Sequence, residues 1–156
     1  MNLNLSNKTF IISGSSRGIG FKIAESLLKE GANTIITGRS KSLIKNQYNK
    51  LKSKFGLQVA YVDGDIKSNI VLKKIKNLLK KRWRKLDGIV ANAGSVKKAS
   101  GSFSSEKDFY WYQENNFLTS FKFVNYFLSE IKKNQGSIIF ISSIASLKDL
   151  GAPLGF

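Results

Sequence analysis

Three glycines separate an apolar run from an amphipathic run in the segment FIISGSSRGIGFKIAESLLKEGA, which covers residues 10–32. Gly14, Gly18 and Gly20 follow the spacing G-x-x-x-G-x-G. A glycine-rich turn between a strand and a helix lets a pyrophosphate approach bare backbone N–H groups at the helix N-terminus. The turn therefore indicates a dinucleotide site, although a tight strand-to-helix turn without a ligand would use the same residues.

The charged residues around this turn favour one form of the dinucleotide. NAD sites use a carboxylate about 20 residues after the turn to bind the ribose hydroxyls, but no acidic residue lies between Glu30 and Asp63. Arg39 follows the second apolar run instead, and Arg17 lies within the turn. Because guanidinium groups pair strongly with phosphate, we expect NADP as the cofactor, with NADPH preferred over NADH. The alternative is that both arginines are only exposed surface residues.

The elements that must position these residues alternate along the chain. Short apolar runs predict strands at 9–13, 34–37, 57–62, 86–92 and 137–142. Longer periodic segments between them predict helices from Ile19 to a C-terminal cap at Gly31, over 42–55 and over 69–83. A fourth, aromatic helix carries Phe109, Tyr112, Phe117, Phe121, Val124 and Leu128. This alternation is typical of an α/β fold with a doubly wound parallel sheet, and we expect one domain over residues 1–156.

Composition narrows the chemistry that such a domain can perform. The 156 residues include no cysteine and no histidine, which excludes disulfides and thiolate metal sites and removes the commonest general base. We therefore expect no metal, and any catalysis would depend on hydroxyls, amines or carboxylates. Because the sequence has neither an apolar run of membrane-spanning length nor a secretory signal, we expect a soluble, cytoplasmic protein with no membrane partner.

The strong positive charge raises a different class of function. With 26 Lys and Arg against 10 Asp and Glu, the formal charge is +16, and such an excess attracts polyanions. The densest basic run, KKIKNLLKKRWRK at 73–85, has apolar residues at helical spacing, which predicts the solvated face of an amphipathic helix. The Phe and Trp residues fall at helical positions expected to face the core, whereas nucleic-acid binding uses exposed aromatics. A basic nucleic-acid-binding module is therefore the less favoured alternative, and we expect only nonspecific, salt-labile association with nucleic acid.

The glycine turn also resembles a known family. The segment SGSSRGIG resembles the T-G-x-x-x-G-I-G turn of short-chain dehydrogenases/reductases, with Ser13 in place of Thr. Further resemblance lies in VDGDI, in VANAG with Ala91 in place of the first Asn of N-N-A-G, in NNFLTSF and in GSIIFISSIAS. The motifs stand in the family's order and cover nearly all of the chain. The resemblance implies a Rossmann-like NAD(P)-binding domain that transfers hydride between NADP(H) and a small-molecule carbonyl or alcohol substrate.

The resemblance further implies roles for individual residues. Asp65 would contact the adenine, Asn116 would help hold a proton-relay water, and Ser143 would be the catalytic serine that hydrogen-bonds the substrate oxygen. Taken singly, each has a structural alternative, as a turn former, a partner of backbone groups or an ordinary loop serine. The cofactor-binding set would comprise Gly14, Ser16, Arg17, Gly18, Ile19, Gly20, Arg39, Ser40, Asp65, Ile66, Asn92, Ala93 and Gly94.

One part of the family's machinery has no counterpart in the sequence. Family members carry a Tyr-x-x-x-Lys motif on the next helix, where the lysine lowers the pKa of the tyrosine that acts as acid or base. Phe156 stands where that tyrosine commonly falls, and no tyrosine follows Tyr126. We therefore expect a fold truncated after the fifth strand and lacking the family's C-terminal part. The 156-residue polypeptide is expected to have no meaningful carbonyl reductase activity.

Two consequences follow from this expectation. A non-catalytic nucleotide-binding remnant becomes the alternative function. In addition, the strand predicted at 137–142 would become an exposed apolar edge, which predicts poor solubility or pairing with a partner. The family's tendency to form homo-oligomers is therefore not expected to carry over to this chain.

Overall fold

A parallel sheet forms the centre of the computed structural model, which describes residues 3–96 and 105–147. Its five strands lie in the order β3-β2-β1-β4-β5. Their bounds are β1 Thr9–Ile12, β2 Asn33–Gly38, β3 Val59–Asp63, β4 Gly88–Ala91 and β5 Ser137–Phe140. Every neighbouring pair is parallel, so the predicted doubly wound α/β fold is confirmed.

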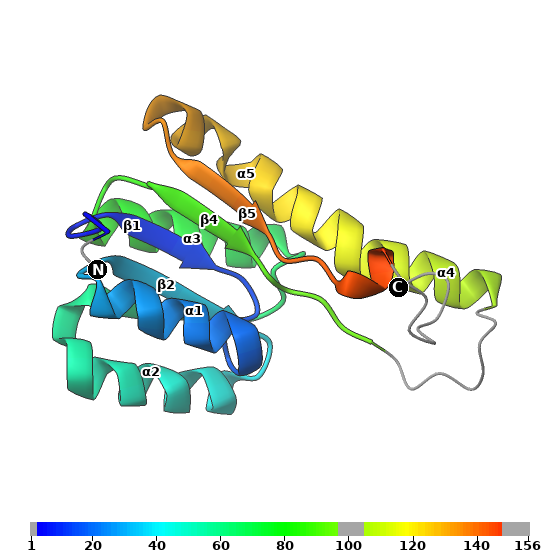
Figure 1. Cartoon of the computed structure of the whole chain (residues 1–156), viewed down its shortest axis with the longest axis horizontal. Helices are drawn as coiled ribbons and strands as arrows, with labels where there is room; N and C mark the ends of the chain where they lie inside the picture. The colour runs from blue at the N-terminus through cyan, green and yellow to red at the C-terminus, as the bar shows by residue number, and fades with distance from the viewer. Residues whose placement is uncertain (1–2, 97–104, 148–156) are drawn as a thin grey trace.

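Helices cover both faces of this sheet (Figure 1). Helices α1 (Gly18–Lys29) and α2 (Lys41–Phe55) pack on one face. Helices α3 (Asn69–Arg82) and α5 (Thr119–Lys133) pack on the other. Helix α4 (Glu106–Tyr112) continues into α5 through a π-helical turn, η2 (Gln113–Leu118). A short 3-10 helix, η1 (Gly56–Gln58), precedes β3, so that strand begins two residues later than predicted.

The central strands β1 and β2 each carry two consecutive isoleucines because both of their faces are buried. Ile11 and Ile35 face the core beneath α3 and α5, while Ile12 and Ile36 face the core beneath α1 and α2. Successive side chains of a strand point to opposite faces, and a sheet covered on both sides therefore requires an unbroken apolar run. Because every neighbouring pair is parallel, the carboxyl ends of the strands lie along one edge of the sheet.

Helix α1 ends as its sequence predicts. Gly31 adopts a φ of +81° beyond the last helical residue, Lys29. The Gly31 N–H donates to the Leu28 carbonyl and the Ala32 N–H donates to the Leu27 carbonyl, both at 3.0 Å. These two bonds form a Schellman motif, in which a left-handed residue is most easily a glycine.

The aromatic helix differs from its prediction. Phe109, Phe117 and Phe121 were expected on the core face, but they are 44%, 61% and 55% exposed. The π-helical turn between α4 and α5 changes the angular register of the side chains. Phe123 and Phe127 therefore form the buried stripe of α5. Phe117 stacks on Phe121 at the surface, with ring centroids 6.3 Å apart.

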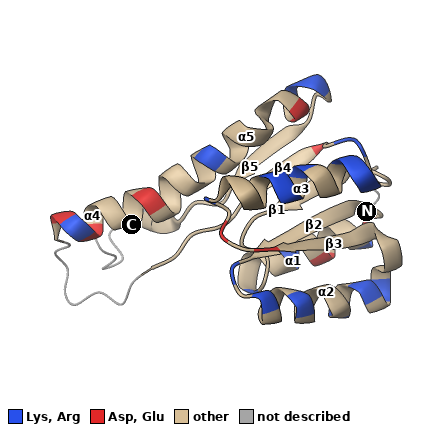
Figure 2. Ribbon diagram, turned by 180° about the vertical axis from the view of Figure 1, so that it is seen from behind, with Lys and Arg blue, Asp and Glu red and all other residues tan. Residues whose placement is uncertain are grey.

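The basic residues of α3, coloured blue on the ribbon of Figure 2, are largely exposed to solvent, as predicted. Val71, Ile75 and Leu79 are buried beneath it. Two of its cations nevertheless have structural partners. Lys76 pairs with Glu130 of α5 at 2.5 Å, and Arg82 donates to the carbonyls of Val59 and Leu57.

A buried carboxylate ties the amino ends of the strands together, at the edge opposite the glycine turn. Asp87 accepts the Thr9 N–H at 2.9 Å and pairs with Lys85 at 3.0 Å and Lys8 at 3.4 Å. Its backbone bonds to Thr9 and to Ser137, so the residue joins β1, β4 and β5. Burial opposes ionisation of Asp87, but the Thr9 hydrogen bond and the two lysines outweigh it and hold the pKa below its ordinary value of 3.8.

This lowered pKa predicts how stability depends on pH. Because Asp87 has a lower pKa in the folded state than in the unfolded state, its contribution is complete above the unfolded pKa. That contribution is lost as the pH falls through the folded pKa. Asp87→Asn is expected to cost about 1 to 3 kcal/mol at neutral pH and to flatten the acid limb of stability against pH. Urea denaturation at several pH values measures both effects, and parallel curves for the two proteins would contradict the assignment.

Candidate functional site

A cavity of about 230 Å³ lies beyond the carboxyl ends of the strands. From β1 the chain adds β2 and then β3 on one side of β1, and then β4 and β5 on its other side. The direction in which strands are added to the sheet therefore reverses between β1 and β4. Ligands of open α/β sheets bind at this reversal point. The cavity is lined by Gly14, Ser16, Arg17, Thr37, Gly38, Arg39, Ser40, Leu43, Gly64, Asp65, Ile66, Lys67, Ala93, Gly94, Ser95, Asn115 and Thr119.

The glycine turn after β1 needs its glycines for two different reasons. Gly14 and Gly18 adopt φ values of +63° and +58°, a region that side chains with a Cβ avoid. A Cβ on Gly14 would also lie 2.9 Å from the Ala93 Cα, and a Cβ on Gly20 would lie 2.7 Å from the Gly14 carbonyl oxygen. Nothing lies within 4 Å of a Cβ placed on Gly18. Gly14 and Gly20 thus allow close packing of the turn, whereas Gly18 supplies conformation alone.

Two buried serine hydroxyls hold this turn, in a role that was not predicted from the sequence. The Ser13 hydroxyl accepts the N–H groups of Asn92 and Ala93, each at 2.9 Å. The Ser15 hydroxyl accepts the Thr37 N–H at 2.8 Å and donates to the Ile12 carbonyl at 2.8 Å. One feature of the sequence could have indicated this role. Ser13 stands where the resembling family has threonine, and both residues carry a hydroxyl group. Together the two serines fasten the turn to the ends of β2 and β4.

The segment after β4 is built against the same turn. The Asn92 side chain donates to the carbonyls of Ser13 and Gly14 at 3.1 and 3.0 Å. Asn92 therefore hydrogen-bonds backbone carbonyls and fixes the turn. This is the structural role that the sequence offered as an alternative to cofactor binding. Ala93 and Gly94 line the cavity.

Most of the predicted cofactor-binding residues meet at this cavity. Gly14, Ser16, Arg17, Arg39, Ser40, Asp65, Ile66, Ala93 and Gly94 line it. Gly18, Ile19, Gly20 and Asn92 are not part of the lining. Gly20 and Asn92 support the turn from behind, whereas Ile19 is an exposed residue of α1.

Positive charge is concentrated at one end of the cavity. Arg17 precedes α1 and Arg39 follows β2, and both are exposed lining residues. Within residues 3–96 and 105–147, neither guanidinium is paired with a carboxylate. Ser40 caps α2 by accepting the Leu43 N–H at 3.4 Å. This end thus combines two cations with the N-terminus of a helix, an arrangement that favours an anion.

The loop after β3 provides another wall. One Asp65 carboxylate oxygen accepts the Lys67 N–H at 2.9 Å, so Asp65 does act as a turn former. The residue also lines the cavity. Ile66 is 6% exposed and belongs to the core beneath α3 and α5.

The two predicted catalytic residues lie in different surroundings. The side-chain oxygen of Asn116, Oδ1, accepts the Ser95 N–H at 2.8 Å. The side-chain nitrogen of Asn116, Nδ2, is buried without a hydrogen-bond partner among the described residues. The half-buried Ser143 accepts the Ala145 N–H at 3.2 Å and caps a short 3-10 helix, η3 (Ile144–Ser146). The structure does not place Asn116 or Ser143 in the lining of the cavity, and Phe156 lies outside the described residues.

Over 3–96 and 105–147, no group of three or more His, Cys, Asp or Glu side chains is arranged to hold a metal ion. Over the same ranges, no helix has both the length and the apolar character needed to cross a bilayer.

The chain is similar to many known proteins. A family model described as short chain dehydrogenase matches residues 8–152. An uncharacterized oxidoreductase of Saccharomyces cerevisiae is 35% identical over 144 residues, which are 88% of this chain and 54% of that protein. The first three curated relatives are covered over only 54% to 60% of their length.

Solved structures show the same architecture. L-Sorbose reductase from Gluconobacter frateurii, complexed with NADPH and L-sorbose, superposes with a TM-score of 0.87 at 25% identity. The match covers 99% of this chain and 59% of the reductase. A short chain dehydrogenase/reductase from Burkholderia phymatum in complex with NAD gives a TM-score of 0.83 at 20% identity. That match covers 97% of this chain and 54% of the other, and its low identity shows the shared fold alone.

Proposed function

The chain belongs to the short chain dehydrogenase family, and we propose that its residues bind NADP(H) as the cofactor-binding part of an oxidoreductase. The protein that contains them would transfer hydride between NADP(H) and a small-molecule carbonyl or alcohol. The observation that carries the choice of cofactor is the pair of exposed guanidiniums, Arg17 and Arg39, at one end of the cavity.

The residues at the cavity fit a pyrophosphate-linked dinucleotide. Gly14 leaves a space that a Cβ could occupy only by displacing Ala93, and the β1–α1 turn leads directly into the N-terminus of α1. Backbone N–H groups at a helix N-terminus favour a pyrophosphate. When bound, the nicotinamide would supply the hydride. Ser16, Arg17, Arg39 and Ser40 would hold the 2′-phosphate end, and Gly14, Ala93 and Gly94 would lie against the rest of the cofactor.

The chemical step needs more groups than the cavity lining provides. In the proposal, Ser143 hydrogen-bonds the substrate oxygen and Asn116 holds a proton-relay water. An acid or base is still required to move the proton. The sequence places Phe156 where the family's tyrosine commonly falls and has no tyrosine beyond Tyr126. For the 156-residue polypeptide, we therefore propose nucleotide binding without carbonyl turnover.

Arg39→Ala tests the choice of cofactor. The variant is expected to lose NADPH affinity by about 10-fold to 100-fold, because it removes a charge-assisted hydrogen bond to the 2′-phosphate. NADH affinity should change little, since NADH carries no such phosphate. Calorimetric titration of both nucleotides at matched ionic strength measures the change in preference.

Lys41→Ala is the matched control. Lys41 is exposed and lies only two residues further along the chain, but it does not line the cavity. Its removal changes the net charge equally and should leave the preference for NADPH intact. Equal affinities of the unmodified chain for NADPH and NADH would reject the NADP assignment. An Arg39→Ala variant that keeps the preference would reject the role of Arg39.

A further inference from the structure

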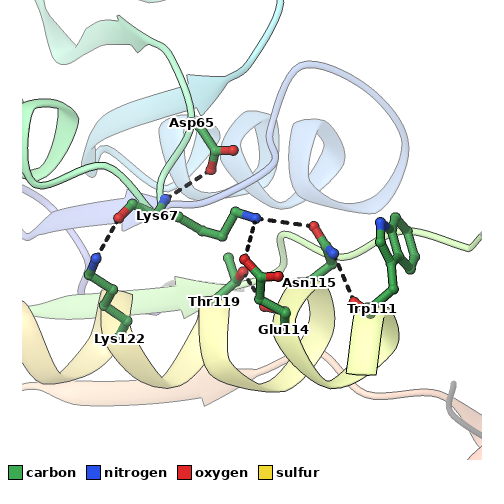
Figure 3. A network of polar contacts seen from close by, with 7 residues as sticks. All are labelled: Asp65, Lys67, Trp111, Glu114, Asn115, Thr119 and Lys122. Atoms are coloured by element: carbon green, nitrogen blue, oxygen red, sulfur yellow. Dashed lines mark hydrogen bonds and ion pairs between the residues drawn. The ribbon is translucent and has the colours of Figure 1, made fainter. Parts of the chain in front are cut away.

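Lys67 is held from three directions at the wall of the cavity (Figure 3). Its ammonium group pairs with Glu114 at 3.0 Å and donates to the side-chain oxygen of Asn115, Oδ1, at 3.5 Å. Its backbone carbonyl accepts a hydrogen bond from the Lys122 ammonium group at 2.7 Å. Its backbone N–H donates to Asp65 at 2.9 Å.

These contacts join two separate parts of the chain. Asp65 and Lys67 belong to the loop 64–68 between β3 and α3, whereas Glu114 lies in the π-helical turn and Lys122 lies in α5. The loop lines one side of the cavity, and Asn115 and Thr119 line it from the helix. The Lys67 contacts therefore set the distance between two walls of the same cavity.

The loop lies on the side of the cavity where the arginines are. The Gly64 N–H donates to the Gly38 carbonyl at 3.0 Å, and Arg39 follows Gly38 directly. If Arg17 and Arg39 bind the 2′-phosphate, the adenosine part of the nucleotide must lie beside this loop. The inference below therefore rests on the proposed function.

These contacts are expected to fix the position of the loop 64–68 and to add little to the free energy of unfolding. Glu114 is exposed over 59% of its side chain, and ion pairs of this kind contribute little to stability because solvent screens them. The Lys122 bond to a backbone carbonyl is charge-assisted and fixes a main-chain atom of the loop. Losing either contact would free the loop while leaving the core beneath α3 and α5 intact.

We propose that Glu114 and Lys122 are positioning residues that hold the loop 64–68 against the helix, so that the loop forms the adenosine-side wall of the nucleotide site. They act through Lys67 and Asp65. Neither Glu114 nor Lys122 belongs to the lining of the cavity.

Amide hydrogen exchange on the ligand-free chain tests the positioning without any nucleotide. Lys122→Met and Glu114→Gln are expected to raise exchange in a peptide covering 64–68, because the loop then opens more often. Lys76→Met is the matched control, since it removes a lysine ammonium group that pairs α3 with Glu130 of α5 and does not contact the loop. The control should leave exchange at 64–68 unchanged. Unchanged exchange in Lys122→Met, or an equal rise in the control, would overturn the inference.

Binding of adenosine 2′,5′-bisphosphate then tests the consequence for the site. Lys122→Met is expected to weaken it by about fivefold to tenfold, with little change in melting temperature. This is less than the loss expected for a direct contact with the nucleotide, because Lys122 acts only through the position of the loop. Lys122→Arg should restore the affinity, because its guanidinium can donate to the same carbonyl. Unaltered affinity in Lys122→Met, or an equal loss in Lys76→Met, would overturn the inference alone. If the unmodified chain binds neither this probe nor NADPH, the proposed function is wrong. The exchange measurement needs no nucleotide, so it would still test whether Glu114 and Lys122 hold the loop.

Discussion

Gly14→Ala is expected to abolish nucleotide binding and to destabilise the domain by about 2 to 5 kcal/mol. The added methyl group would meet the Ala93 Cα at 2.9 Å, and the backbone φ of +63° is unfavourable for alanine. Relief requires movement of the turn away from β4, and the turn is the part of the structure proposed to receive the pyrophosphate. NADPH titration and urea denaturation of the variant measure the two losses.

Gly18→Ala and Gly56→Ala separate the two causes. Both glycines have a positive φ close to that of Gly14, but neither has an atom within 4 Å of an added Cβ. Each variant should therefore lose only the conformational contribution, about 1 to 2 kcal/mol. Gly56 also lies far from the cavity lining, after α2, so its variant should bind NADPH normally. Equal stability losses in all three variants would contradict the importance of the contact with Ala93.

Ser13→Ala is expected to destabilise the domain by about 2 to 5 kcal/mol and to weaken NADPH binding together with it. The hydroxyl is the shared acceptor for the N–H groups of Asn92 and Ala93, and the residue is only 1% exposed. Its loss leaves the N–H groups of two part-buried residues without this acceptor, and an unsatisfied donor is costly. Thermal and urea denaturation, followed by nucleotide titration, measure the effect.

Ser13→Thr provides the control for this prediction. Threonine keeps the acceptor oxygen and adds one methyl group, so most of the lost stability and binding should return. A Ser13→Thr variant as unstable as Ser13→Ala would show that packing at this position matters more than the hydrogen bonds. A Ser13→Ala variant with unchanged stability would contradict the structural role assigned to the hydroxyl.

Strand β5 lies at one edge of the sheet, and its apolar side chains are exposed among the described residues. Among the described residues, β5 pairs only with β4, and Ile139 and Phe140 are 52% and 54% exposed. Phe117 and Phe121 add exposed aromatic surface on the neighbouring helical segment. An unpaired apolar edge is a template for association. This agrees with the apolar edge predicted from the sequence, whereas solubility and pairing stay predictions.

The order of elements could be predicted from the sequence because it depends on local properties. Alternating apolar runs and helical periodicities predict strands and helices, since each pattern reflects burial along one element. Gly31 predicts the end of α1 for the same reason: a left-handed residue after a helix is most easily a glycine. Among the nine predicted residues that line one cavity, Gly14, Arg17 and Arg39 were predicted from residue type and spacing, whereas Asp65, Ala93 and Gly94 came from the family resemblance. They meet because parallel strands end at a common edge.

Other features were decided only by the tertiary structure, because they depend on contacts between distant residues. Ser13 looks like an ordinary turn serine until β4 brings the N–H groups of Asn92 and Ala93 to its hydroxyl. The π-helical turn altered which aromatic residues face the core, so Phe117 and Phe121 are exposed against expectation. The sequence alone determined which residues could bind a dinucleotide, since that depends on residue type and spacing. Long-range packing decided which of them meet at the cavity and that Lys67 would join its two walls.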